Sequence, residues 1–139
     1  MLWGEKALNF ELITSKENKL IKTVRKLLTS AKERKQSGTF VLEGLRLSAD
    51  AARNGNATDT VIASETLQMT DLVNEICTLA KTKVKVPEGL FNYICDTVSP
   101  QGILCVVKIP KTVLGFNNIP DGKYIVLENT ADPSNLGAI

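Results

Sequence analysis

The sequence predicts an α/β domain with a mostly parallel sheet, followed by the start of a second unit. Two observations predict this fold class. Short runs rich in β-branched residues alternate with longer segments in which apolar residues recur every three or four positions. The 139 residues are also 43% hydrophobic and 23% charged, which is typical of a domain that buries a core.

The first element is a predicted amphipathic helix over residues 16–35, with Ser15 as its N-cap. This stretch holds eight basic residues and two acids. At about 100° per residue, Lys19, Lys22 and Lys26 fall opposite the apolar stripe. The helix is therefore a candidate nucleic-acid-binding face, and an ordinary solvated helix surface is the alternative. The stripe consists of Leu20, Val24, Leu27, Leu28 and Ala31.

The later elements alternate along the chain. Predicted strands cover residues 39–42, 60–63, 84–86 and 102–108. Predicted helices cover residues 45–54 and 66–81, and Pro87 opens a shorter one. Gly55 suits the C-cap of the helix over residues 45–54. The run over residues 102–108 is apolar from Ile103 to Val107 and rich in β-branched residues, which predicts a strand at the centre of the sheet.

The amino-acid composition changes after residue 109. Residues 110–122 are rich in proline, glycine and asparagine, which predicts a linker between residues 1–109 and a second unit. Residues 123–127 form another predicted strand. For residues 128–139 the sequence predicts a polar turn followed by the start of a helix. We expect residues 123–139 to be the first strand and turn of a truncated domain. A lone strand has no sheet of its own, so we expect a tail or pairing with an exposed edge.

Composition excludes several kinds of chemistry. There is no histidine, so Ser-His and Cys-His nucleophiles are excluded. Cys77, Cys95 and Cys105 show no metal-binding spacing, and we expect buried thiols in a reducing compartment and no metal site. No apolar run reaches the length of a membrane span, and the N-terminus lacks the pattern of a secretory signal. We therefore expect a cytoplasmic protein without a membrane partner.

Two short motifs lie where a strand meets a turn. Glu43, Gly44 and Arg46 follow the strand over residues 39–42, at the position where α/β proteins commonly bind ligands. Arg46 can contact a phosphate, and Glu43 can orient Arg46 or accept a hydrogen bond from a base. Gln101 lies in a Ser-Pro-Gln-Gly turn and can reach a nucleotide. An ordinary helix start and an ordinary turn are the structural alternatives.

Four motifs, taken together, resemble the SpoU (TrmH-like) family of RNA ribose 2′-O-methyltransferases. Ser15 and Asn18 match an S-x-x-N opening, and residues 40–46 match F-x-x-E-G-x-R. Residues 99–102 match the S-x-Q-G type of turn. Residues 132–139 match D-P-G-N-x-G-x-I, with Ser134 where glycine is usual. The resemblance covers nearly the whole chain from Ile13 onward.

The resemblance implies a fold and a division of labour. The family's N-terminal domain is a small three-layer α/β sandwich similar to kink-turn-binding ribosomal proteins, and it presents the RNA substrate. Its C-terminal SPOUT domain is knotted, binds S-adenosylmethionine and usually forms a homodimer. The chain would thus be the RNA-binding portion, with ribosomal RNA as the expected partner, of an S-adenosylmethionine-dependent RNA 2′-O-ribose methyltransferase.

The resemblance also assigns a catalytic position. The asparagine that matches Asn135 lies in the family's active site, and an arginine six residues later is thought to activate the ribose hydroxyl. An arginine can lower a hydroxyl pKa without a histidine. That position would be 141, beyond the last residue of the sequence. We therefore expect no cofactor-binding residues and no catalysis within residues 1–139.

RNA binding is the function that we expect these residues to carry. The lysines and Arg25 neutralise phosphates, and Arg34, Arg46 and Gln101 suit contacts at a structured or unpaired site. Because aromatic residues are sparse, we expect shape and backbone recognition. Two alternatives stay open: a stand-alone kink-turn-type RNA-binding module, and a small α/β domain that binds a metabolite or a protein. The candidate RNA-binding residues are Asn18, Lys19, Lys22, Lys26, Arg34, Glu43, Arg46 and Gln101.

Overall fold

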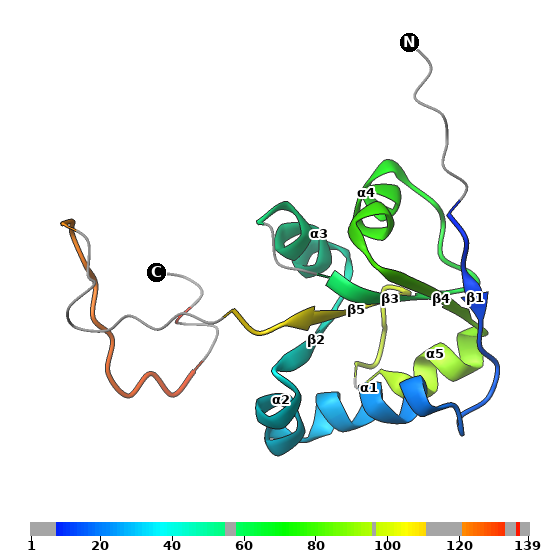
Figure 1. The fold of residues 1–139 in the computed structure, drawn as a ribbon, viewed down its shortest axis with the longest axis horizontal. Coiled ribbons are helices and arrows are strands. Elements are labelled where there is room, and N and C mark those ends of the chain that lie inside the picture. Colours follow the sequence, from blue (N-terminus) through cyan, green and yellow to red (C-terminus); the bar gives the residue numbers. More distant parts are fainter. Residues whose placement is uncertain (1–7, 55–57, 96, 111–120, 133–135, 137–139) are drawn as a thin grey trace, which may run out of the picture.

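The computed structural model describes residues 8–54, 58–95, 97–110, 121–132 and 136. Within them, five strands form one sheet, and helices cover both of its faces (Figure 1). The predicted α/β class is confirmed. In chain order the elements are β1 (Glu11–Leu12), α1 (Lys19–Thr29), α2 (Ala31–Ser37), β2 (Thr39–Glu43), α3 (Leu45–Arg53), β3 (Thr58–Ser64), α4 (Asp71–Leu79), β4 (Thr82–Val86), α5 (Glu88–Ile94) and β5 (Ile103–Lys108).

The sheet is mixed: the prediction of a mostly parallel sheet holds for the four strands that run in one direction and fails for β5. The strand order is β1-β4-β3-β5-β2. β4 runs parallel to β1 and β3, whereas β5 runs antiparallel to both β3 and β2. The seven-residue helix α5 and the turn after it return the chain to the end of the sheet where β4 stops. Since β5 starts at that end, it runs opposite to its neighbours. The two-residue strand β1 was not predicted.

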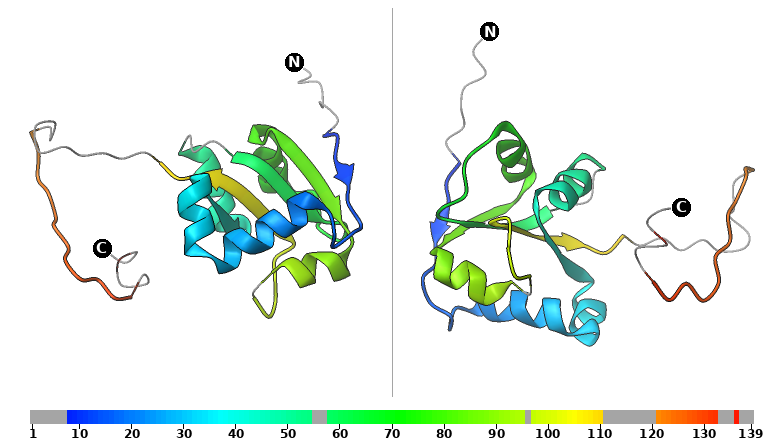
Figure 2. Two further views of the ribbon diagram at one scale, coloured as in Figure 1. Left: turned by 60° about the horizontal axis from the view of Figure 1, so that its bottom comes forward. Right: turned by 180° about the vertical axis from the view of Figure 1, so that it is seen from behind.

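The predicted central strand is an interior strand of the sheet. β5 lies between β3 and β2, and five of its six residues are buried. Its side chains alternate between the two faces, as the two-residue period of a strand requires. Leu104 and Val106 pack in the cluster under α1 and α5. Ile103, Cys105 and Val107 pack in the cluster under α3 and α4, so the domain has three layers (Figures 1 and 2).

The predicted helix over residues 16–35 is two helices. α1 starts at Lys19 because residues 15–18 form a turn, and the Asn18 side chain, rather than Ser15, accepts from the amide of Leu20 at 2.8 Å. Ser30 is extended and caps α2. Ile21 was missed by the predicted stripe and is fully buried. The stripe residue Ala31 is exposed.

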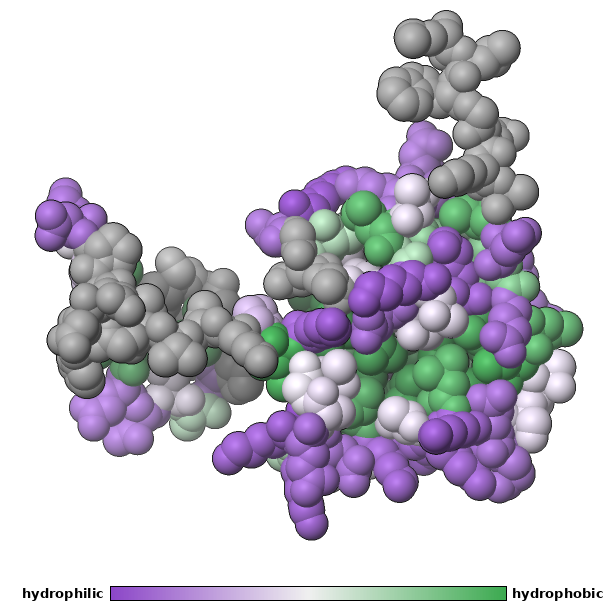
Figure 3. Space-filling view, viewed as in Figure 1, coloured by the Kyte–Doolittle hydropathy of each residue, from purple (hydrophilic) through white to green (hydrophobic). Residues whose placement is uncertain are grey.

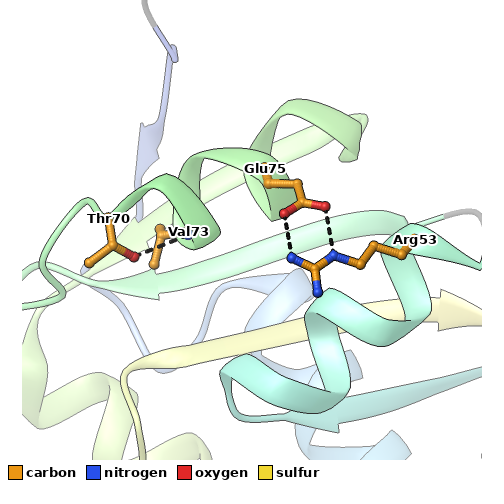
Figure 4. A network of polar contacts seen from close by, with 4 residues as sticks. All are labelled: Arg53, Thr70, Val73 and Glu75. Atoms are coloured by element: carbon orange, nitrogen blue, oxygen red, sulfur yellow. Dashed lines mark hydrogen bonds and ion pairs between the residues drawn. The ribbon is translucent and has the colours of Figure 1, made fainter.

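The other helices start where their caps place them. α4 begins at Asp71, not at residue 66, because the Thr70 hydroxyl accepts from the amide of Val73 at 3.3 Å. Small residues of α3 are buried, and Arg53 at its end donates two hydrogen bonds of 2.9 Å to Glu75 of α4 (Figure 4). The ion pair joins α3 and α4 at the surface. Asn54 follows α3 as its C-cap, and Gly55 lies outside the described residues.

Residues 123–127 are not a strand. The segment 121–132 has no regular secondary structure, and Tyr124, Ile125, Val126 and Leu127 are all exposed. β-Branched residues favour a strand only where a neighbouring strand accepts and donates hydrogen bonds, and no described residue pairs with this segment in a sheet. The expectation of a tail, not of edge pairing, therefore holds for the described part.

The pKa of Cys105 predicts how stability depends on pH. Burial raises the pKa of its thiol from about 9.0 to about 11. The folded state therefore favours the neutral thiol, and its contribution is complete below pH 9 and is lost as the pH rises toward 11. A shift of this size corresponds to about 2–3 kcal/mol.

Urea unfolding of the wild-type and Cys105→Ala proteins between pH 7 and 11, with a reductant present, measures this effect. We expect the free-energy difference between the two proteins to shrink above pH 9. A difference that stays constant up to pH 11 contradicts the assignment.

Candidate functional site

One end of the sheet gathers the ends of four strands. β2, β3 and β4 finish there and β5 begins there, since Glu43 pairs with Leu104 and Ser64 pairs with Val86. The amide of Gly44 donates to the carbonyl of Ile103 at 3.1 Å, and the amide of Ser64 donates to the carbonyl of Gly102 at 2.8 Å. The loop after β2 and the loop before β5 thus lie side by side.

These two loops enclose a cleft of about 330 Å³. Glu43, Arg46 and Gln101, which the sequence predicts as site residues, all line it. The structure therefore brings together side chains that are up to 58 positions apart in the chain. The complete lining is Glu43, Gly44, Arg46, Leu47, Thr97, Ser99 and Gln101.

Gln101 is held by the backbone at the start of α3. Its Oε1 atom accepts from the amide of Leu45 at 2.9 Å. Gly44 has a φ of +100°, and a Cβ atom at this position would lie 2.8 Å from Oε1 of Gln101. Only glycine therefore permits this approach. Because the oxygen is engaged, the amide nitrogen of Gln101 keeps its two donors, which no described residue accepts.

Glu43 and Arg46 do not form an ion pair, although the sequence allowed Glu43 to orient Arg46. The Glu43 carboxylate instead accepts a short hydrogen bond from the Thr97 hydroxyl. Arg46 is exposed on the first turn of α3, and no carboxylate of the described residues pairs with it. Its guanidinium therefore presents a free positive charge with five donors at the cleft.

The candidate residues of α1 and α2 differ in their surroundings. Lys19 and Lys26 are exposed, and Lys22 forms an ion pair with Glu17. Arg34 is half-buried and donates to the carbonyls of Leu27 and Leu28 at 2.7 and 3.1 Å, so it caps α1. Hydrophilic residues cover the lower rim of the molecule in Figure 3, where Figure 1 places α1 and α2.

The candidate residues thus fall into two groups. Glu43, Arg46 and Gln101 line one cleft, whereas the α1 lysines form a separate basic surface on the helix itself. Asn18 serves as the N-cap of α1. Asn135 lies outside the described residues. Thr97 was not predicted as a site residue, because only the folded chain shows that its hydroxyl reaches Glu43.

A second cleft of about 240 Å³ adjoins the first and shares Gln101 with it. Phe91 and Leu67 supply apolar walls, while Asn92 and Gln68 supply side-chain amides. Two adjacent clefts therefore lie at this end of the sheet. The full lining is Ser64, Thr66, Leu67, Gln68, Glu88, Phe91, Asn92, Pro100, Gln101 and Gly102.

Residues 18–105 match the family model described as the MRM3-like substrate binding domain. The chain belongs to this family. The match includes both loops of the cleft and all of α1. The resemblance to SpoU-type methyltransferases inferred from the four motifs is confirmed.

A curated relative and several solved structures agree with this assignment. The chain is 30% identical over 129 residues to the 23S rRNA (guanosine(2553)-2′-O)-methyltransferase RlmP of Bacillus subtilis, covering 91% of this chain and 48% of the relative. An AdoMet-bound rRNA methyltransferase from Sinorhizobium meliloti has a TM-score of 0.62 at 23% identity, over 74% of this chain and 38% of the other. The SpoU methyltransferase AviRb from Streptomyces viridochromogenes, in complex with AdoMet, has a TM-score of 0.62 at 20% identity, over 76% and 40%.

The solved structures show the shared fold, and the family match shows the family. At 23% and 20% identity, the two structures establish that the fold is shared. The chain spans about half the length of the curated relative, 48% of it. Family membership therefore rests on the match over residues 18–105, and the activity of the longer relatives is not transferred by it.

Charges of both signs line the cleft. The Glu43 carboxylate keeps its negative charge while it accepts from the Thr97 hydroxyl, and the Arg46 guanidinium is positive. Among the described lining residues, Leu47 is the one large apolar side chain. The described residues also contain no group of three or more potential metal ligands, and none of their helices is long and apolar enough to cross a membrane.

Gly44 provides a test of the cleft geometry. We expect Gly44→Ala to destabilise the domain by about 1–3 kcal/mol, because alanine is strained at a φ of +100° and its methyl group displaces Gln101. Gly89→Ala in α5 is the matched control, because no atom lies within 4 Å of its added Cβ. Chemical unfolding measures both. Equal stability of the two variants contradicts the proposed packing of Gly44 against Gln101.

Proposed function

We propose that this chain binds RNA through the cleft between the loop after β2 and the loop before β5. The observation that carries the proposal is the pair of free donor groups there: the Arg46 guanidinium and the Gln101 amide nitrogen, which no described residue engages. The guanidinium suits a phosphate, and the amide suits a base edge or a ribose hydroxyl. This combination matches a nucleotide better than a purely anionic ligand.

The basic surface of α1 extends the proposed RNA-binding face. Lys19 and Lys26 are exposed without carboxylate partners among the described residues, so they can neutralise phosphates. Lys22 exchanges its surface ion pair with Glu17 for a phosphate at small cost. Arg34 contributes indirectly, because its bonds to Leu27 and Leu28 hold the end of α1. Asn18 fixes the other end.

The larger protein that we propose is an S-adenosylmethionine-dependent RNA 2′-O-ribose methyltransferase acting on ribosomal RNA. Support comes from the family match and from the similarity to RlmP, whose name states a 23S rRNA 2′-O-methyltransferase. In this proposal the described domain presents RNA as kink-turn-binding ribosomal proteins do. Asn135 belongs to the active site of a knotted methyltransferase domain, and that domain forms the homodimer.

Arg46 gives the sharpest test of RNA binding at the cleft. We expect Arg46→Ala to weaken binding to a ribosomal RNA fragment by about tenfold or more, since a hydrogen-bonded charge contributes about 1.5–3 kcal/mol. Fluorescence anisotropy across a salt series measures the change. Arg53→Ala is the control: it removes the same charge at the other end of α3, where Arg53 contacts Glu75.

The outcomes separate the alternatives. Equal binding by Arg46→Ala and Arg53→Ala shows that the cleft is not the site. Wild-type protein that shows no preference for RNA over heparin or DNA contradicts the function, and favours the reading of a metabolite- or protein-binding domain.

Residues 1–139 also allow RNA binding to be tested separately from methyl transfer. We expect RNA binding without transfer of a methyl group, because the resemblance assigns S-adenosylmethionine binding to the C-terminal SPOUT domain and not to the domain that holds this cleft. Incubation with RNA and tritiated S-adenosylmethionine measures transfer, and calorimetry measures cofactor binding. Full-length RlmP from Bacillus subtilis is the positive control. Labelled RNA produced by residues 1–139 alone contradicts the expectation.

A further inference from the structure

The seam between α1 and α5 contains an aromatic ring with two cations. Tyr93 lies near the end of α5, and 40% of the residue is exposed. The Nζ atom of Lys16 lies 4.3 Å from the ring centroid, and the guanidinium carbon of Arg25 lies 4.1 Å from it. The three residues come from the turn before α1, from α1 and from α5. We call this set the Tyr93 cluster.

Fastening α1 to α5 does not require the whole cluster. Arg25 donates to the backbone carbonyl of Tyr93 at 2.6 Å, which caps the last turn of α5 whatever the side chain at this position. Beneath it, buried residues of both helices already pack together. The packed residues are Ile21, Val24, Leu27, Leu90, Phe91 and Ile94.

The charges of the cluster are not balanced by the rest of the described structure. Lys16 and Arg25 have the same sign, and bringing them to one ring costs electrostatic energy. No carboxylate among the described residues pairs with either, because the neighbouring Glu17 pairs with Lys22. A bound anion in contact with either cation would offset this repulsion. The guanidinium still has N–H donors besides the one bonded to Tyr93, and the ammonium has three.

The chemistry of the cluster matches one nucleotide of an unpaired RNA segment. Phosphate oxygens accept from a guanidinium and an ammonium, and a base stacks on a tyrosine ring or on an arginine plane. Lys19 and Lys26 continue the positive surface along α1. On α5, the residue before Tyr93 is Asn92, which lines the cleft that contains Gln101. α5 therefore contributes a residue to each of the two places.

We propose that Lys16, Arg25 and Tyr93 form a second RNA contact, which holds the phosphate and the base of an unpaired nucleotide beside α5. The proposal rests on the proposed RNA-binding function, and it adds a contact outside the cleft of Arg46. It would add base stacking to the shape and backbone recognition that the sequence predicts.

Two measurements on the full chain test the phosphate and the base separately. With a single-stranded RNA oligonucleotide, we expect Lys16→Ala to lower the salt slope of log affinity by about 0.7, the value for one phosphate of a single strand. With the same oligonucleotide carrying 2-aminopurine, we expect Tyr93→Ala to abolish stacking-dependent quenching and to weaken binding about fivefold or more. Tyr93→Phe keeps the ring, so we expect it to retain both.

The controls separate this proposal from the first one. Lys108→Ala removes an exposed lysine at the far end of β5, and we expect the salt slope to stay unchanged. Circular dichroism confirms that each variant is folded, and Lys16→Ala provides a result even if Tyr93→Ala is unstable. Suppose that Arg46→Ala weakens binding, but Lys16→Ala leaves the salt slope unchanged and Tyr93→Ala leaves the quenching unchanged. The second RNA contact is then wrong, and the proposed RNA binding at the cleft still holds. If wild-type protein binds no RNA, the proposed function itself fails.

Discussion

The pairing of β5 between β2 and β3 is the constraint on which the rest of the domain depends. β5 supplies side chains to both apolar clusters and hydrogen bonds to two neighbouring strands. An interior strand leaves little freedom in register, because a shift by one residue would move Leu104 and Val106 to the opposite face. The positions of the loops at both ends of β5 follow from this register.

The same register builds the candidate site. With Glu43 opposite Leu104, the loop after β2 lies against the turn before β5, and Gln101 reaches the amide of Leu45. Gly44 makes the close approach possible because it has no Cβ. The Gln101 amide is therefore positioned by a contact that the register of the sheet fixes, whereas the exposed Arg46 guanidinium is engaged by no described residue. A binding site with preorganised donors spends less free energy on ordering them.

The far end of β5 has a different role. There Thr39 pairs with Lys108, and the amide of Ile109 donates to the carbonyl of Gly38 at 2.8 Å. Six residues of strand separate this end from the cleft, about 20 Å at 3.3 Å per residue. The described chain therefore leaves the sheet at the end opposite the cleft.

Local pattern in the sequence determined much of this domain. Runs of β-branched residues located β2, β3, β4 and β5, and helical spacing located the basic helix, because these signals depend on neighbours within a few positions. The loop motifs identified Glu43, Arg46 and Gln101. Tertiary structure decided the direction of β5 and the absence of a strand over residues 123–127, since each depends on a partner distant in sequence. The break at Ser30 is instead a local cap, which the helical spacing of apolar residues did not reveal. Tertiary structure also decided which side chains meet. Arg25 and Tyr93 are 68 positions apart, and Gln101 and Leu45 are 56 apart, so no periodicity predicts either contact; only the packing of the sheet and its helices brings them together.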